Sequence, residues 1–269
     1  KDAPTASRLA SFLALFVGIS LDFIFLCADA SSAFMQGGPD ESRGHRLFMR
    51  PPYNGRLQGV PLGALLEIIG SVYGLVNAPR LWWRTLAGFL VNVLHWVVCS
   101  LDQAFLYKYE NGTLVGLCLL QVDDAFFLVK YEALLDPVRE RFDWGKWERN
   151  DFVWSGRHII RLNDRVKIHQ AQFNEAIEIA KPHSSDRKDT KAPLNAEYKS
   201  EVKSCNGSLQ WVGGQTRPEM AGVCSLLQGG DPTMETHHFK DIRKIEYLDK
   251  CSWIQYFLLG ARHFPKTIK

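Results

Sequence analysis

The sequence predicts an α+β fold in which an antiparallel sheet packs on helices, followed by a small, mostly helical C-terminal region. Three observations predict it: a hairpin signal over residues 105–121, paired apolar runs over 114–130 and a periodic helical segment over 81–97. The chain has 269 residues, of which 46% are hydrophobic and 23% charged, so it can bury a substantial core. Its net charge of +3 permits a nucleic-acid partner without requiring one.

The first apolar run, residues 9–27, is long enough to suggest a membrane span. Gly18 and Asp22 lie inside it and favour another interpretation. We expect a helix over residues 7–17 that ends at Gly18, followed by a strand over residues 23–28. A membrane partner is therefore not expected.

Six cysteines are scattered along the chain without any CxxC pair. Most lie in apolar surroundings, which is typical of reduced core residues and not of a zinc site or a disulfide framework. The pattern favours an intracellular protein, either cytoplasmic or nuclear.

The segments between the first strand and the hairpin are a short strand, a loop and a long helix. Residues 47–49 read as a strand stopped by two prolines, and residues 53–62 as a loop rich in Gly and Pro. A helix is expected over residues 81–97, with Pro79 near its first turn. Its inward positions are expected to be Trp82, Trp83, Leu86, Phe89, Leu90 and Val93.

The hairpin over residues 105–121 turns at Asn111-Gly112, a pair typical of a type I′ turn. The next turn holds two adjacent carboxylates, Asp123 and Asp124, between apolar strands. Like charges in such a place repel one another and are costly to desolvate, and a Mg²⁺ ion with oxygen ligands would compensate them. The pair is equally typical of a solvated turn. Asp29, at the end of the first strand, could simply be a helix or turn cap.

Residues 132–142 look helical, with a break or a new start at Pro137. A strand is expected over residues 152–161, turning at Asn163-Asp164 into a second strand over 166–169. In a strand, Arg157 and Arg161 would share one face, which could hold phosphates or form a solvated edge.

The chain is expected to divide at a polar linker rich in Lys and Pro. This division gives a first domain over residues 1–181, a linker over 182–204 and a helical region over 205–269. Short helices are expected over residues 208–213, 218–228 and 236–248.

Six sequence blocks occur in the order typical of one protein family. They are CADASSAFMQG (27–37), LFMRPP (47–52), SVYGLVNAPRLWW (71–83), QVDD (121–124), FVWSGRHI (152–159) and SLQWVGGQTRPEMAGVCSLL (208–227). Together they resemble the reverse transcriptases of Ty1/copia retrotransposons, whose motifs include DVKTAFLNG, LYGLKQAPRxWY and YVDD.

The resemblance implies an RNA-directed DNA polymerase with a palm-type sheet. Residues 1–181 would form the palm with partial fingers, and residues 205–269 a region like a thumb or connection domain. Asp29, Asp123 and Asp124 would be catalytic and would hold two Mg²⁺ ions, or Mn²⁺, roughly 4 Å apart. A deoxynucleoside triphosphate would be the substrate, with an RNA template and a DNA primer as partners.

The resemblance also implies roles for residues around these carboxylates. The carbonyl of Ala30 would add a metal ligand, Phe34 would lie beneath the deoxyribose, and Tyr73 and Gly74 would line the nucleotide pocket. Residues implied to contact template or primer are Gln121, which stands where the family has Tyr, together with Ala78, Pro79, Ser155, Gly156, Arg157 and Arg161.

Four family features do not match any segment of this sequence. The basic fingers segment would precede Pro4, and the RNase H domain would follow the last block; protease and integrase are likewise unmatched. RNase H and integrase are therefore expected partners from the same polyprotein. The alternative is an inactive or co-opted relic that serves as a structural or nucleic-acid-binding subunit of a larger complex.

Overall fold

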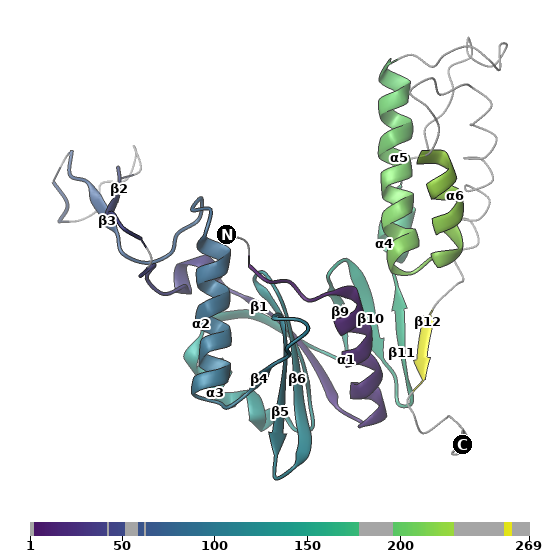
Figure 1. The fold of residues 1–269 in the computed structure, drawn as a ribbon, viewed down its shortest axis with the longest axis horizontal. Coiled ribbons are helices and arrows are strands. Elements are labelled where there is room, and N and C mark those ends of the chain that lie inside the picture. The colour runs from purple at the N-terminus through teal and green to yellow at the C-terminus, as the bar shows by residue number, and fades with distance from the viewer. Residues whose placement is uncertain are drawn as a thin grey trace. The chain divides into compact units, whose positions relative to one another are not determined.

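The computed structural model describes residues 3–41, 43–51, 59–61, 63–177, 196–228 and 256–259. Helices and antiparallel sheets make up these residues, which confirms the predicted α+β fold (Figure 1). The chain divides into two compact units: Lys1–Trp154 with Asn163–Arg165 and Leu258–Lys269, and Ser155–Leu162 with Val166–Phe257. This division falls upstream of the predicted boundary at residue 181.

A six-stranded sheet forms the centre of the first unit, and every neighbouring pair in it is antiparallel. In spatial order its strands are β4 (Val97–Val98), β5 (Phe105–Glu110), β6 (Thr113–Gln121), β7 (Asp124–Val129), β1 (Ile24–Ala30) and β8 (Trp144–Arg149). The early strand β1 lies between β7 and β8, so segments far apart in the sequence meet at its end.

Helices cover both faces of this sheet. On one face, α2 (Ala78–Asn92) buries Trp82, Leu86 and Leu90 in a core that also holds Phe127. On the other face, α1 (Arg8–Ser20) packs against β6 and β7, as Figure 1 shows. The short helices η1 (Ala33–Gln36), η2 (Glu132–Leu135) and α3 (Asp136–Arg141) complete the unit. The helix α3 starts at Asp136 with Pro137 in its first turn, which agrees with the predicted break or new start at Pro137.

The helix α1 begins as predicted but continues past Gly18 to Ser20. Ser7 caps it, because its Oγ accepts a hydrogen bond from the Ala10 N–H at 3.1 Å. A β-carbon added at Gly18 would lie 2.5 Å from Leu128 Cδ2 and 2.9 Å from Phe25 Cε1. Gly18 therefore lets the helix approach the sheet, and the prediction that it ends the helix was wrong.

No helix in the part of the chain that the structure describes is long and apolar enough to cross a membrane.

The predicted end of α2 was also wrong. The helix starts at Ala78, with Pro79 in its first turn, and stops at Asn92 instead of Val97. Val97 belongs to β4, which pairs with β5, and Val93 is 57% exposed where an inward position was expected. Pairing with the sheet therefore overrides the helical periodicity over the last few positions.

The hairpin of β5 and β6 turns where the sequence predicts. Asn111 and Gly112 have φ values of 50° and 76°, as a type I′ turn requires. The predicted strand over residues 47–49 is β2 (Leu47–Met49), which pairs with β3 (Leu66–Ile68). Most of the loop predicted over 53–62 lies outside the described residues.

The strand predicted over residues 152–161 is two strands, so that prediction was wrong. Ser155 and Gly156, with φ values of 50° and 71°, form a tight turn between β9 (Asp151–Trp154) and β10 (Arg157–Arg161). The turn into β11 (Arg165–His169) is confirmed. In the second unit β10 pairs antiparallel with β11, and a further strand, β12, is described at Tyr256–Leu259.

Three helices belong to the described residues of the second unit. They are α4 (Ala171–Glu175), α5 (Ala196–Gln215) and α6 (Pro218–Gln228). The helix α6 matches its predicted bounds, whereas α5 takes in residues 196–204 of the predicted linker as well as the short helix predicted over 208–213. The helix predicted over 236–248 lies outside the described residues.

Candidate metal centre

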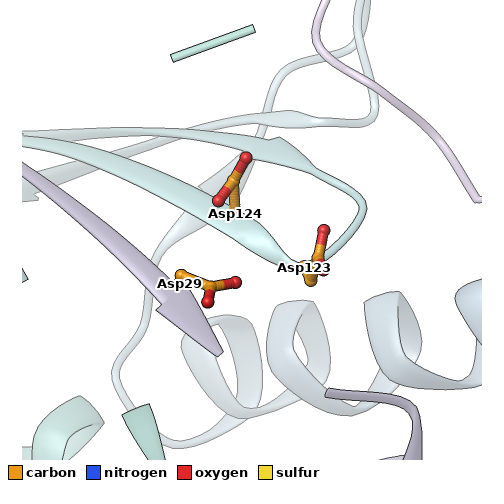
Figure 2. Close-up of side chains that lie close together, drawn as sticks. All are labelled: Asp29, Asp123 and Asp124. Carbon is orange, nitrogen blue, oxygen red and sulfur yellow. The ribbon is translucent and has the colours of Figure 1, made fainter. Parts of the chain in front are cut away.

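Three carboxylates meet at the end of the central sheet. Asp29 lies near the end of β1, Asp123 in the turn between β6 and β7, and Asp124 at the start of β7 (Figure 2). One ligand atom from each lies within 4.8 Å of the others. We call these residues the acidic triad. Antiparallel pairing places Asp29 opposite Asp124, and the Ala30 N–H donates to the Asp123 carbonyl at 3.1 Å.

The turn that carries Asp123 has an unusual backbone. Gln121 pairs with Asp124, which leaves Val122 and Asp123 at the tip, and Val122 has a φ of 55°. A β-branched residue is rarely found at positive φ, because its side chain crowds the backbone there. Strain of this kind persists only where the flanking structure holds it, and it is concentrated at functional sites. The buried strands β6 and β7 supply that support.

A bulge in β8 shapes the other side of the site. Ala28 pairs with Trp147 and Ala30 with Trp144, so β8 has one extra residue opposite Asp29. A β-carbon added at Gly145 would lie 3.4 Å from the Asp29 carbonyl oxygen and 3.6 Å from its Oδ2. Sequence reasoning missed Gly145, although a glycine inside a strand is a signal of a bulge or a close approach.

The acidic triad concentrates negative charge at a place where Asp124 is half-buried and Asp29 and Asp123 are exposed. Burial, and then the charges of Asp123 and Asp29, raise the pKa of Asp124 to about 6. Burial, and then Asp123, also raise the pKa of Asp29. The raised pKa values of Asp124 and Asp29 mean that ionising these carboxyl groups is costly without a compensating cation. Three clustered carboxylates are hard oxygen ligands, and they fit a divalent ion such as Mg²⁺ or Mn²⁺.

Two of the residues predicted to contact the nucleotide lie together. The rings of Phe34, in η1, and Tyr73 have centroids 4.9 Å apart. Tyr73 is 59% exposed, and Gly74 beside it has a φ of 93°, a conformation that favours glycine. The side chain of Ala30 is buried, so only its backbone is available for the predicted metal contact.

The predicted template and primer residues of the first unit differ in exposure. Gln121 is half-buried at the end of β6, where Thr5 forms a bridge with it. Pro79 is half-buried and Ala78 is buried at the start of α2. The methyl group of Ala78 therefore packs inside the protein, and only its neighbour Pro79 has exposed surface.

The other four predicted contacts lie in the second unit and not in the unit that holds the acidic triad. Ser155 and Gly156 form the β9–β10 turn, and Trp211 lies close to Gly156. Arg157 and Arg161 begin and end β10. Arg157 is only 3% exposed, so the two arginines do not form the open face that strand periodicity suggests.

No protein-family model matches the chain, and no curated protein matches it either.

Proposed function

We propose that this chain is the RNA-directed DNA polymerase core of a Ty1/copia-type retroelement. It would add deoxynucleotides to the 3′-hydroxyl of a primer paired with an RNA template. The observation that carries the proposal is the convergence of Asp29, Asp123 and Asp124 from three separate positions at one end of an antiparallel sheet. That position agrees with the palm-type site that the motif order implies.

The carboxylates of the acidic triad provide the ligands that nucleotidyl transfer needs. Divalent ions held by Asp29, Asp123 and Asp124 would supply the chemistry, by lowering the pKa of the primer hydroxyl and neutralising charge on the triphosphate and the leaving pyrophosphate. The protein holds the three carboxylates in place through the β1–β7 pairing, the strained Val122 turn and the close approach of Gly145 to Asp29. Prior positioning of this kind accounts for much of the catalysis of phosphoryl transfer.

The pair of Phe34 and Tyr73 would select the sugar of the incoming nucleotide. Contact with Tyr73 restricts where the Phe34 ring can lie, and Gly74 leaves the adjacent backbone open. A ribose 2′-hydroxyl would then clash with the ring. Phe34→Ala should increase ribonucleotide incorporation by about tenfold or more relative to deoxynucleotide incorporation. Unchanged sugar selectivity in single-nucleotide assays would remove this role from Phe34.

Primer extension on poly(rA)/oligo(dT) with dTTP and Mg²⁺ tests the proposal. Asp123→Asn should lower extension by at least about a hundredfold, because the substitution removes a charged ligand. Asp22→Asn is the matched control, since Asp22 is exposed before β1 and its positive φ suits asparagine. Extension by the control should equal that of the parent.

Two results would count against the proposal. Equal extension by Asp123→Asn and the parent would remove the catalytic role of the triad. Binding of the primed template without extension, in either Mg²⁺ or Mn²⁺, would favour the alternative of an inactive nucleic-acid-binding subunit.

A further inference from the structure

The chain turns sharply directly after Asp29. Ala30 ends β1, Ser32 has a φ of 50°, and η1 then carries Phe34. This turn links a carboxylate of the acidic triad to the aromatic ring of the proposed nucleotide pocket. The contacts that hold this turn therefore determine where the Phe34 ring lies relative to the Asp29 carboxylate.

The side chain of Gln36 holds the turn from its far end. Its Nε2 donates to the carbonyl oxygens of Ser31 and Asp143, both at 2.8 Å, and its Oε1 accepts from the Asp143 N–H at 2.9 Å. The Ser31 N–H also donates to the Asp143 carbonyl at 3.0 Å. Gln36 thus exchanges a donor and an acceptor with the backbone of Asp143, as paired residues in an antiparallel ladder do. We call these four hydrogen bonds the Gln36 clasp.

The clasp reaches the other side of Asp29 through β8. Asp143 directly precedes Trp144, which pairs with Ala30. A β-carbon at the next residue, Gly145, would lie 3.6 Å from Asp29 Oδ2. Asp29 therefore lies beside the start of β8, and Gln36 bonds that start to the turn that follows Asp29. Movement of Asp143 would displace the β8 backbone next to Asp29.

We propose that Gln36 is a positioning residue that keeps Asp29 in the acidic triad and so sets the affinity of the triad for divalent cations. It does not touch the cation; it acts through Asp29. The inference deepens the proposed function because it rests on the same metal centre, but it does not require that the protein extend a primer.

Only a side chain with both a donor and an acceptor at this length can form the clasp. Leucine at position 36 has a similar size and forms none of the three side-chain bonds. Glutamate could still accept from the Asp143 N–H, but its second oxygen would face the carbonyls of Ser31 and Asp143 and repel them. We therefore expect both Gln36→Leu and Gln36→Glu to loosen the turn.

Amide hydrogen exchange tests the clasp without any cation. In Gln36→Leu the amides of Ala30 and Ser31, which donate to Asp123 and Asp143, should exchange at least about tenfold faster. Amides in the β5–β6 hairpin should keep the parent rates. Unchanged exchange at Ala30 and Ser31 would contradict the clasp.

Terbium luminescence in the full-length protein tests the effect on the metal centre. Tb³⁺ is a hard cation that takes oxygen ligands, and Trp144, the partner of Ala30, can sensitise its emission. Displacement of Tb³⁺ by Mg²⁺ then gives the affinity for both ions. Gln36→Leu should weaken binding about tenfold, and Gln36→Glu should also weaken it. The control is Gln103→Leu, the same change at an exposed residue in the turn before β5, and it should bind as the parent does.

A double-mutant cycle separates positioning from general destabilisation. In an Asp29→Asn background, Gln36→Leu should cause no further loss of affinity, because Gln36 acts through Asp29. An equal loss in both backgrounds, or binding by Gln36→Leu within twofold of the parent, would overturn the inference. Tight binding with the expected coupling but no primer extension would overturn the polymerase proposal alone. A parent signal insensitive to Asp29→Asn would overturn both.

Discussion

Asp29 and Asp124 are direct partners in the β1–β7 ladder. A like-charged pair at opposing positions of two strands is destabilising. The sheet tolerates the pair although burial and neighbouring charges raise the pKa of both groups. The arrangement of Asp29 and Asp124 therefore lowers the stability of the folded protein, and the cation in our proposal would offset that cost.

Replacing Asp124 should therefore stabilise the protein in the absence of metal. The folded-state pKa of about 6 lies above the usual value of 3.8, so ionisation of Asp124 opposes folding above pH 6. This cost disappears as the pH falls through 6 toward 4. In EDTA, Asp124→Asn should raise the free energy of unfolding at pH 7.5 by about 1 kcal/mol, a figure reduced for partial solvent exposure.

Urea denaturation of both proteins at pH 7.5 and pH 4 measures this effect. Carboxylates outside the acidic triad titrate equally in the two proteins, so the difference between them reports the charge of Asp124 together with its coupling to Asp29 and Asp123. The difference should shrink at pH 4. A variant less stable than its parent at pH 7.5 would show that Asp124 forms favourable contacts that outweigh the repulsion.

Val122→Asn should relieve the turn between β6 and β7. Asparagine accepts a φ of 55° more readily than valine, so the free energy of unfolding should rise by about 0.5–1 kcal/mol. Primer extension should stay close to that of the parent, because asparagine keeps the backbone conformation that places Asp123. The control is Val153→Asn, at a half-exposed strand position, which should be slightly destabilising and leave extension unchanged. A destabilised Val122→Asn protein would argue against backbone strain.

Gly18→Ala should destabilise the first unit by about 1–3 kcal/mol. The new methyl group would overlap Leu128 and Phe25, and the helix could avoid them only by moving from the sheet. Gly88→Ala in α2 is the matched control, because its β-carbon would meet only Asn92 Nδ2 at 3.8 Å. That change should stabilise the helix by up to about 1 kcal/mol. Thermal unfolding of the two variants compares them, and equal melting temperatures would contradict the packing role of Gly18.

Much of the fold follows from local sequence signals. The Asn111-Gly112 turn fixes the β5–β6 hairpin because few other residues accept positive φ at two successive positions. Pro79 marks the start of α2, because the fixed φ of proline suits the first turn of a helix and its missing N–H costs no hydrogen bond there. The motif blocks indicate Asp29, Asp123 and Asp124 from the sequence alone, and the structure brings these three together.

The errors arose where distant contacts decide the local structure. Gly18 looks like a helix end until Leu128 and Phe25 are in place against it. Val97 continues a helical period but pairs with β5. Ser155-Gly156 is a dipeptide typical of turns, but the apolar residues on both sides of it favoured one continuous strand.

Gln36 gave no signal in the sequence, because its partner Asp143 lies 107 positions away. Residues whose role depends on such distant backbone contacts become visible only in the folded protein. The folded protein also shows that Arg157 is buried and Arg161 is half-buried, although strand periodicity places both residues on the same face.

The central claim is that Asp29, Asp123 and Asp124 share divalent cations. Anomalous diffraction from crystals grown with Mn²⁺ tests it most directly, since Mn²⁺ takes the same oxygen ligands as Mg²⁺ and scatters anomalously. We predict at least one strong anomalous peak bounded by carboxylate oxygens of all three residues, and its loss in Asp123→Asn crystals. A parent map with no peak at the acidic triad, with Mn²⁺ at millimolar concentration, would contradict the account.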